Sequence, residues 1–177
     1  MRRLIWPVLF LLLILLQGVA SVFFTGWLAL DLPLLFLYSY ALIRGKEKGS
    51  IAGGAIGFVQ DSLTISIFGF HMLTRALFGF AIGWMNKKVF KEQMQLHVII
   101  IGVSSIAIRF CYWWLELIRA GGKWDILPLF IWQSIGYCLG NMLFIIPMVK
   151  LVVYVYEWRR WRWRQGYDLW QEPCSSL

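Results

Sequence analysis

The side chains of this chain that could do chemistry are polar and charged groups inside otherwise apolar stretches. They are Gln60, Asp61, His71, Arg75 and Arg109. An ionised side chain in lipid is costly, so each such group is a candidate for pairing or for function. We expect Asp61 to pair with Arg75 or with Arg109. The pair would belong to a structural ion-pair network or to a pocket that binds a ligand or a partner.

The motifs of common catalytic sites are missing from the sequence. There is no GxSxG, no HExxH and no phosphate-binding glycine loop, and His71 and His97 stand apart. Cys111, Cys138 and Cys174 are widely spaced and form no CxxC pair, which favours neither a metal site nor a disulfide framework. We therefore expect a protein that is not an enzyme and needs no metal or cofactor.

The composition places most of the chain in a membrane. Hydrophobic residues make up 60% of its 177 residues and charged residues 15%, against roughly 45–50% and about 25% in soluble domains. Six apolar stretches approach the length of about 20 residues that spans a bilayer. They cover residues 4–24, 28–43, 50–68, 70–84, 96–117 and 126–156. The sequence predicts an all-α six-helix transmembrane domain over residues 1–156 and a basic tail over 157–177.

Two local features refine this prediction. The third and fourth stretches are joined around Gly69 by so few residues that they should form a tight helical hairpin. Pro147 interrupts the last stretch and predicts a kink or a break there. Glycines four residues apart should let helices approach closely. These are Gly53 and Gly57, Gly79 and Gly83, and Gly136 and Gly140.

The positive charges predict the topology. Of 17 Lys and Arg residues, 13 lie at the ends or in alternate connections, while the opposite connections hold Arg119 and Lys123. The positive-inside rule then places both termini in the cytoplasm. This clustering between apolar runs also argues against nucleic acid as the partner of a chain with net charge +8.

Each end of the chain leaves an alternative open. Residues 1–20 resemble a secretory signal that ends in Gly18-Val19-Ala20, but the apolar run continues to Phe24, so we expect an uncleaved span. The tail alternates aromatic and basic residues, as a membrane-surface anchor or as a docking site for a cytoplasmic partner would. Its residues are Trp158, Arg159, Arg160, Trp161, Arg162, Trp163 and Arg164.

Residues 53–63, followed by Phe68-Gly69-Phe70-His71, resemble the rod shape-determining MreD family. That family has a glycine-rich third span that ends in G-x-x-x-D, followed by a short link with a glycine; here these positions are Gly57, Asp61 and Gly69. Asp31-Leu32-Pro33 and the basic Arg44-Gly45-Lys46 support the resemblance, which covers roughly residues 1–156.

The resemblance implies a non-enzymatic scaffold of the bacterial elongation machinery in the cytoplasmic membrane. Its first partner would be MreC, in a complex with MreB, RodA and a class B penicillin-binding transpeptidase, and in contact with membrane lipid. It also implies a fold like the substrate-binding subunits of energy-coupling-factor transporters. A rival hypothesis is such a vitamin-type importer subunit, but their Ala-x-x-x-Ala motif is missing from the first span, which has only Ala20.

Overall fold

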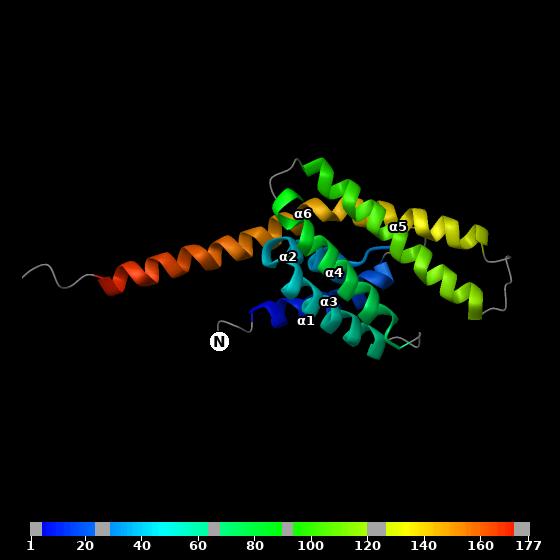
Figure 1. Cartoon of the computed structure of the whole chain (residues 1–177), viewed down its shortest axis with the longest axis horizontal. Coiled ribbons are helices and arrows are strands. Elements are labelled where there is room, and N and C mark those ends of the chain that lie inside the picture. Colours follow the sequence, from blue (N-terminus) through cyan, green and yellow to red (C-terminus); the bar gives the residue numbers. More distant parts are fainter. Residues whose placement is uncertain (1–4, 24–28, 64–67, 90–93, 120–126, 172–177) are drawn as a thin grey trace, which may run out of the picture.

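The computed structural model describes residues 5–23, 29–63, 68–89, 94–119 and 127–171. These residues form six α-helices and no strand, which confirms the all-α prediction (Figure 1). The helices are α1 (Ile5–Phe23), α2 (Leu32–Arg44), α3 (Lys46–Leu63), α4 (Phe70–Val89), α5 (Met94–Arg119) and α6 (Leu127–Gln171). Each helix overlaps one predicted stretch; α3 begins earlier and α4 ends later than the apolar runs.

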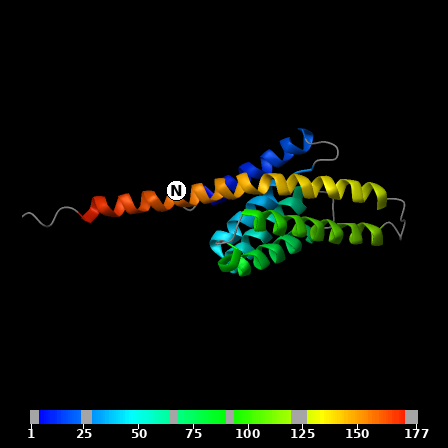
Figure 2. The same cartoon turned by 90° about the horizontal axis from the view of Figure 1, so that it is seen from above.

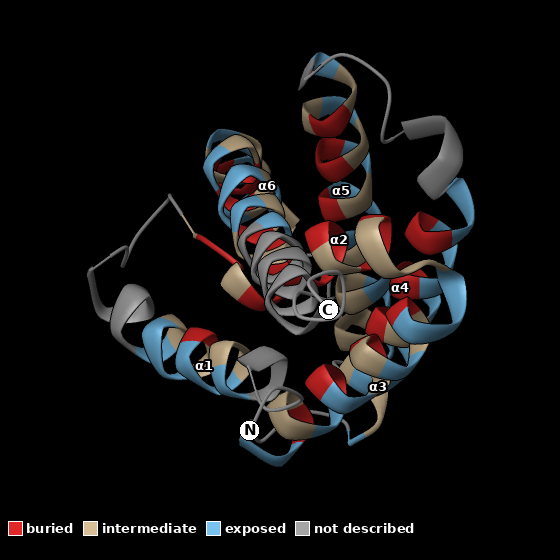
Figure 3. Cartoon of the chain, turned by 90° about the vertical axis from the view of Figure 1, so that its left-hand side faces the viewer, coloured by how far each residue is buried: buried red, intermediate tan, exposed pale blue. Residues whose placement is uncertain are grey.

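Helix α2 forms the centre of the bundle. Asp31 caps its first turn by accepting a 3.0 Å bond from the amide of Leu34, and Pro33 suits that turn because no intrahelical partner is needed there. Its residues are buried nearly all round, as expected of a helix that is apolar on every face. Helix α2 packs against α1, α3, α4 and α6, which surround it (Figures 1 and 3).

Helices α3 and α4 form the predicted close hairpin, although α3 ends at Leu63 and the connection is longer than expected. A Cβ atom on Gly53 would collide with the backbone of Arg75, and one on Gly57 with the backbone of His71. Gly49 and Gly79 meet in the same way. The two backbones are therefore so close that these positions admit glycine alone. Gly136 and Gly140 are buried in α6.

Helix α6 is continuous through Pro147, so of the two predicted alternatives, a kink or a break, the break was wrong. Proline removes one backbone bond and leaves the carbonyl of Leu143 without its helical donor. Both residues are exposed, so no tertiary packing enforces an interruption. The helix curves gently and extends well beyond the bundle (Figures 1 and 2). Its backbone is helical across the predicted boundary at residue 156, and the side chains from Trp158 onward lie outside the described residues.

Within the part of the chain that the structure describes, two helical segments are long and apolar enough to cross a bilayer, Gln95–Arg119 of α5 and Leu127–Glu157 of α6. Within α1 and α2 the apolar segments Val8–Gly18 and Leu32–Arg44 are shorter. Large apolar side chains on α5 and α6 face outward, including Phe110, Trp114 and Trp132. The exposed faces of both helices are visible in Figure 3. Such surfaces suit a lipid environment or a helical partner.

Candidate functional site

The carboxylate of Asp31 is the centre of a buried polar network. Its Oδ2 atom accepts bonds of 2.7 Å from Nη2 of Arg75 and 2.7 Å from the hydroxyl of Tyr137. Its Oδ1 atom caps α2. Asp31 is 9% exposed and Arg75 4%. One side chain thus joins the start of α2 to α4 and α6.

The same network continues through Asn141 of α6. The side-chain oxygen of Asn141 accepts a 3.0 Å bond from the backbone amide of Asp31, and its amide nitrogen donates to Ser105 of α5 at 3.0 Å. On the other side, Gln17 of α1 bonds the backbone of Leu30 and Leu32. Polar bonds therefore connect the residues around Asp31 to four other helices. In lipid such bonds hold helices together where no hydrophobic force acts between them.

Asp61 does not pair with Arg75 or with Arg109, so both predicted pairings were wrong. Its carboxylate instead accepts bonds from three backbone amides at the start of α4, those of Gly69, His71 and Met72, at 3.0, 3.1 and 3.0 Å. It also lies 2.9 Å from Nδ1 of His71. The first amides of a helix lack intrahelical acceptors, and Gly69 has no side chain to serve as a cap. Asp61 supplies the cap from α3 and thereby closes the hairpin.

Arg109 of α5 faces α6. Its Nε atom lies 3.3 Å from the hydroxyl of Ser134 and its Nη2 atom 3.4 Å from the side-chain oxygen of Gln133. The guanidinium also lies over the rings of Phe130 and Tyr137, at 5.0 and 5.7 Å from their centroids. None of the described carboxylates lies within ion-pair distance of Arg109. Glu116, two turns further along α5, pairs with Arg119 at 3.4 Å instead.

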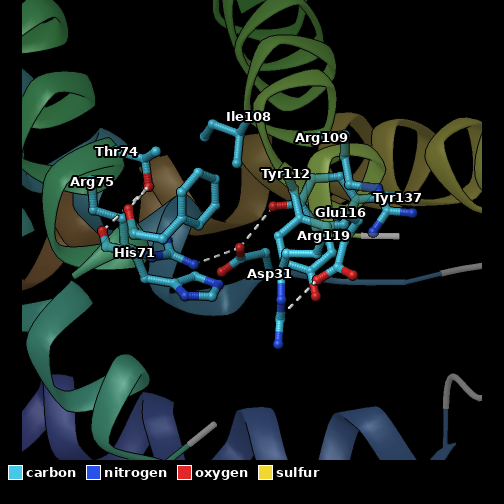
Figure 4. A pocket seen from close by; sticks show the side chains of 11 residues that line it. Asp31, His71, Thr74, Arg75, Ile108, Arg109, Tyr112, Glu116, Arg119 and Tyr137 are labelled. Atoms are coloured by element: carbon cyan, nitrogen blue, oxygen red, sulfur yellow. Dashed lines mark hydrogen bonds and ion pairs between the residues drawn. The ribbon is translucent and has the colours of Figure 1, made fainter. Parts of the chain in front are cut away.

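These groups surround a cavity of about 430 Å³ between α4, α5 and α6. Its lining combines charged side chains with aromatic and aliphatic ones (Figure 4). The lining residues are Asp31, Phe70, His71, Thr74, Arg75, Ile108, Arg109, Tyr112, Glu116, Arg119 and Tyr137. Figure 4 shows Arg75 and Tyr137 meeting at Asp31, with the Glu116–Arg119 pair beside them.

The cavity brings together three of the five residues predicted as a polar cluster, His71, Arg75 and Arg109. Asp61 is not part of the lining but contacts the ring of His71, which is. Gln60 is partly buried and also lies outside the lining. The arrangement can bind an anion and can hold helices in register. Among the described residues, no group of three or more His, Cys, Asp or Glu side chains is placed to hold a metal ion.

Sequence reasoning missed the role of Asp31, Tyr137 and Asn141. Asp31 was noted as the start of a span, which explains its cap but not its pairing. Tyr137 and Asn141 lie four residues apart and so share a helix face, and an Asn inside an apolar run is itself a signal of interhelical bonding. That signal was available in the sequence.

The fold and the site define a class: an all-helical bundle whose helices are joined by buried polar groups and whose described residues include two segments long and apolar enough to cross a membrane. Comparison with protein families identifies the chain more closely. Residues 1–156 match the model of the rod shape-determining protein MreD, and the chain belongs to that family. Its members are membrane proteins that determine cell shape and are generally not enzymes. No curated protein and no solved structure matches the chain, and the likeness to energy-coupling-factor subunits stays a prediction.

Proposed function

We propose that this chain is a membrane scaffold of the bacterial rod complex, with six spans and both termini in the cytoplasm. It binds MreC and helps couple MreB filaments to peptidoglycan synthesis by RodA and a class B penicillin-binding transpeptidase. The observation that carries this proposal is the family match over residues 1–156. A role in shape determination follows from membership, and the partners and the topology are part of the proposal.

The packing of the bundle is consistent with a scaffold. Buried bonds around Asp31 fix α2, α4 and α6 relative to one another. Meanwhile α5 presents Val103, Phe110 and Trp114 on its outer face. A rigid bundle with an apolar outer face can offer a partner's transmembrane helix a surface to pack against.

Depletion of the protein in its own host, with a fluorescent cell-wall label, tests the proposal. Cells should round up and lateral-wall labelling should collapse while nutrients are ample. MreC should also co-purify with the full chain from detergent extracts. Normal shape and labelling after depletion would contradict the scaffold role.

The cavity favours a second candidate, the substrate-binding subunit of a small-molecule importer. Its volume of about 430 Å³ falls in the range of small-molecule sites, roughly 300–1,000 Å³. Such a subunit would retain a water-soluble compound through purification, which mass spectrometry of a denatured extract detects. Depletion would then cause a nutrient requirement without a change in shape.

A further inference from the structure

The guanidinium of Arg75 is only partly satisfied by the chain. Its Nη2 atom bonds Asp31 at 2.7 Å, whereas its Nε and Nη1 atoms are buried with no hydrogen-bond partner among the described residues. The residue is 4% exposed and lines the cavity. Leaving charged donors buried without acceptors is costly. Because Arg75 forms part of the cavity wall, an acceptor bound beside it would offset part of this cost.

The charges around the cavity indicate what that acceptor carries. Three arginines line it, and two carboxylates oppose them. Asp31 is already bonded to Arg75, and Glu116 to Arg119. Arg109 faces hydroxyl, amide and aromatic groups instead. Counting the arginines and carboxylates alone, the lining has one positive charge in excess, which a singly charged anion would neutralise.

The rest of the lining is apolar or aromatic. Phe70 and Tyr112 lie against each other with ring centroids 5.8 Å apart, and Ile108 lines the cavity one turn before Tyr112. Such walls suit an amphiphile whose charged end reaches the arginines while its uncharged part contacts the rings. A phosphodiester fits this description because it carries one negative charge and its oxygens accept several bonds from guanidinium groups.

We propose that this cavity binds a phosphate group, supplied by a phospholipid headgroup. Free inorganic phosphate shares the recognition chemistry and lacks the apolar part. The proposal goes beyond the scaffold role and does not depend on it, because it concerns binding by the isolated protein.

The test uses the purified, delipidated full chain in a neutral detergent. Its melting temperature is followed against dihexanoyl-phosphatidylglycerol, against dihexanoylglycerol, which lacks the phosphate, and against inorganic phosphate. The phosphatidylglycerol should raise the melting temperature with concentration, and dihexanoylglycerol should not. The Arg109→Gln variant should bind the lipid about tenfold or more weakly, as expected when one charged hydrogen-bond donor is lost.

The matched control is Lys150→Gln, which removes one exposed cation of α6 outside the cavity and should leave binding unchanged. Arg119→Gln is a second variant at the rim, where the side chain is 52% exposed and a substitution disturbs packing little. It should also weaken binding. Stabilisation by inorganic phosphate as strong as that by the lipid would support the phosphate site but overturn the phospholipid as its source.

Three results would overturn the proposal. The first is equal stabilisation by dihexanoylglycerol, since the apolar part alone would then bind. The second is equal lipid affinity for the wild type, Arg109→Gln and Arg119→Gln. The third is stabilisation by sodium acetate that matches that by phosphate, since the site would then not distinguish a phosphate group from other small anions.

Discussion

The Nη2 atom of Arg75 lies 2.7 Å from Oδ2 of Asp31, and this ion pair joins two helices through residues 44 positions apart. Both side chains are nearly inaccessible to solvent. Pairing allows each charge to be buried, and Tyr137 and the α2 amide satisfy the rest of the carboxylate. The stability of the bundle should therefore be sensitive to the loss of either side chain.

Replacing Asp31 should strongly destabilise the protein. Asp31→Ala leaves Arg75 buried without its counter-charge, which costs on the order of 3 kcal/mol, and removes the cap of α2 as well. Asp31→Asn should be milder because Asn is a good helix cap. Thermal unfolding in detergent measures both. The control is Glu116→Gln, which breaks an exposed pair and should cost less than about 1 kcal/mol. Similar losses in Asp31→Ala and Glu116→Gln would contradict this prediction.

Asp61 should matter as a helix cap. Asp61→Ala removes the acceptor of three amides at the start of α4 and should lower stability by about 2 kcal/mol, at the upper end for caps. Asp61→Asn should fall between the wild type and Asp61→Ala, since its amide offers one acceptor atom. Ser62→Ala is the control, because this exposed hydroxyl bonds only the carbonyl of Phe58. The cap assignment fails if Asp61→Ala unfolds at the temperature of Ser62→Ala.

The glycines between α3 and α4 allow a test with neighbouring residues. Gly53→Ala would drive a methyl group into the backbone of Arg75 and should cost about 1–3 kcal/mol, as overpacking does. Gly54→Ala meets only the methyl of Ala76, at 3.9 Å, and should be neutral or slightly stabilising because alanine favours helix. Unfolding temperatures of the two variants give the comparison. Equal unfolding temperatures for the two variants would contradict this prediction, because α3 and α4 could then move apart without loss of stability.

The helices and the α3–α4 hairpin could be predicted from the sequence, because long apolar runs and glycine spacing are local signals. Gly49 belongs to the same four-residue series as Gly53 and Gly57, and it could have been included from spacing alone. The partner of Arg75 could not be chosen in this way. Two aspartates were available, and which one reaches Arg75 depends on how α2 packs against α4, which no local pattern encodes.

The same reasoning explains the length of α6 and the role of Asp61. Pro147 is a local signal for an interruption, but whether the helix continues also depends on the packing around that residue. Here Pro147 is exposed, and no neighbouring element forces the helix to end. Asp61 was correctly singled out as a polar residue of the third span. Its interaction with amides rather than with an arginine depends on where the hairpin connection returns, and Gly69, at φ 94°, allows that return.

Double substitutions distinguish the observed pair from the one expected from sequence. Arg75→Gln combined with Asp31→Asn removes both buried charges, so the double variant should lose clearly less stability than the two single losses added together. Arg75→Gln combined with Asp61→Asn should be additive within about 0.5 kcal/mol, because those two side chains share no bond. The measurement is the free energy of unfolding of the three single and two double variants in one detergent. Together with the wild type, these values form two double-mutant cycles, one for Asp31 and one for Asp61. Coupling in the Asp61 cycle with additivity in the Asp31 cycle would reverse the assignment, and the pairing of Arg75 would then be with Asp61.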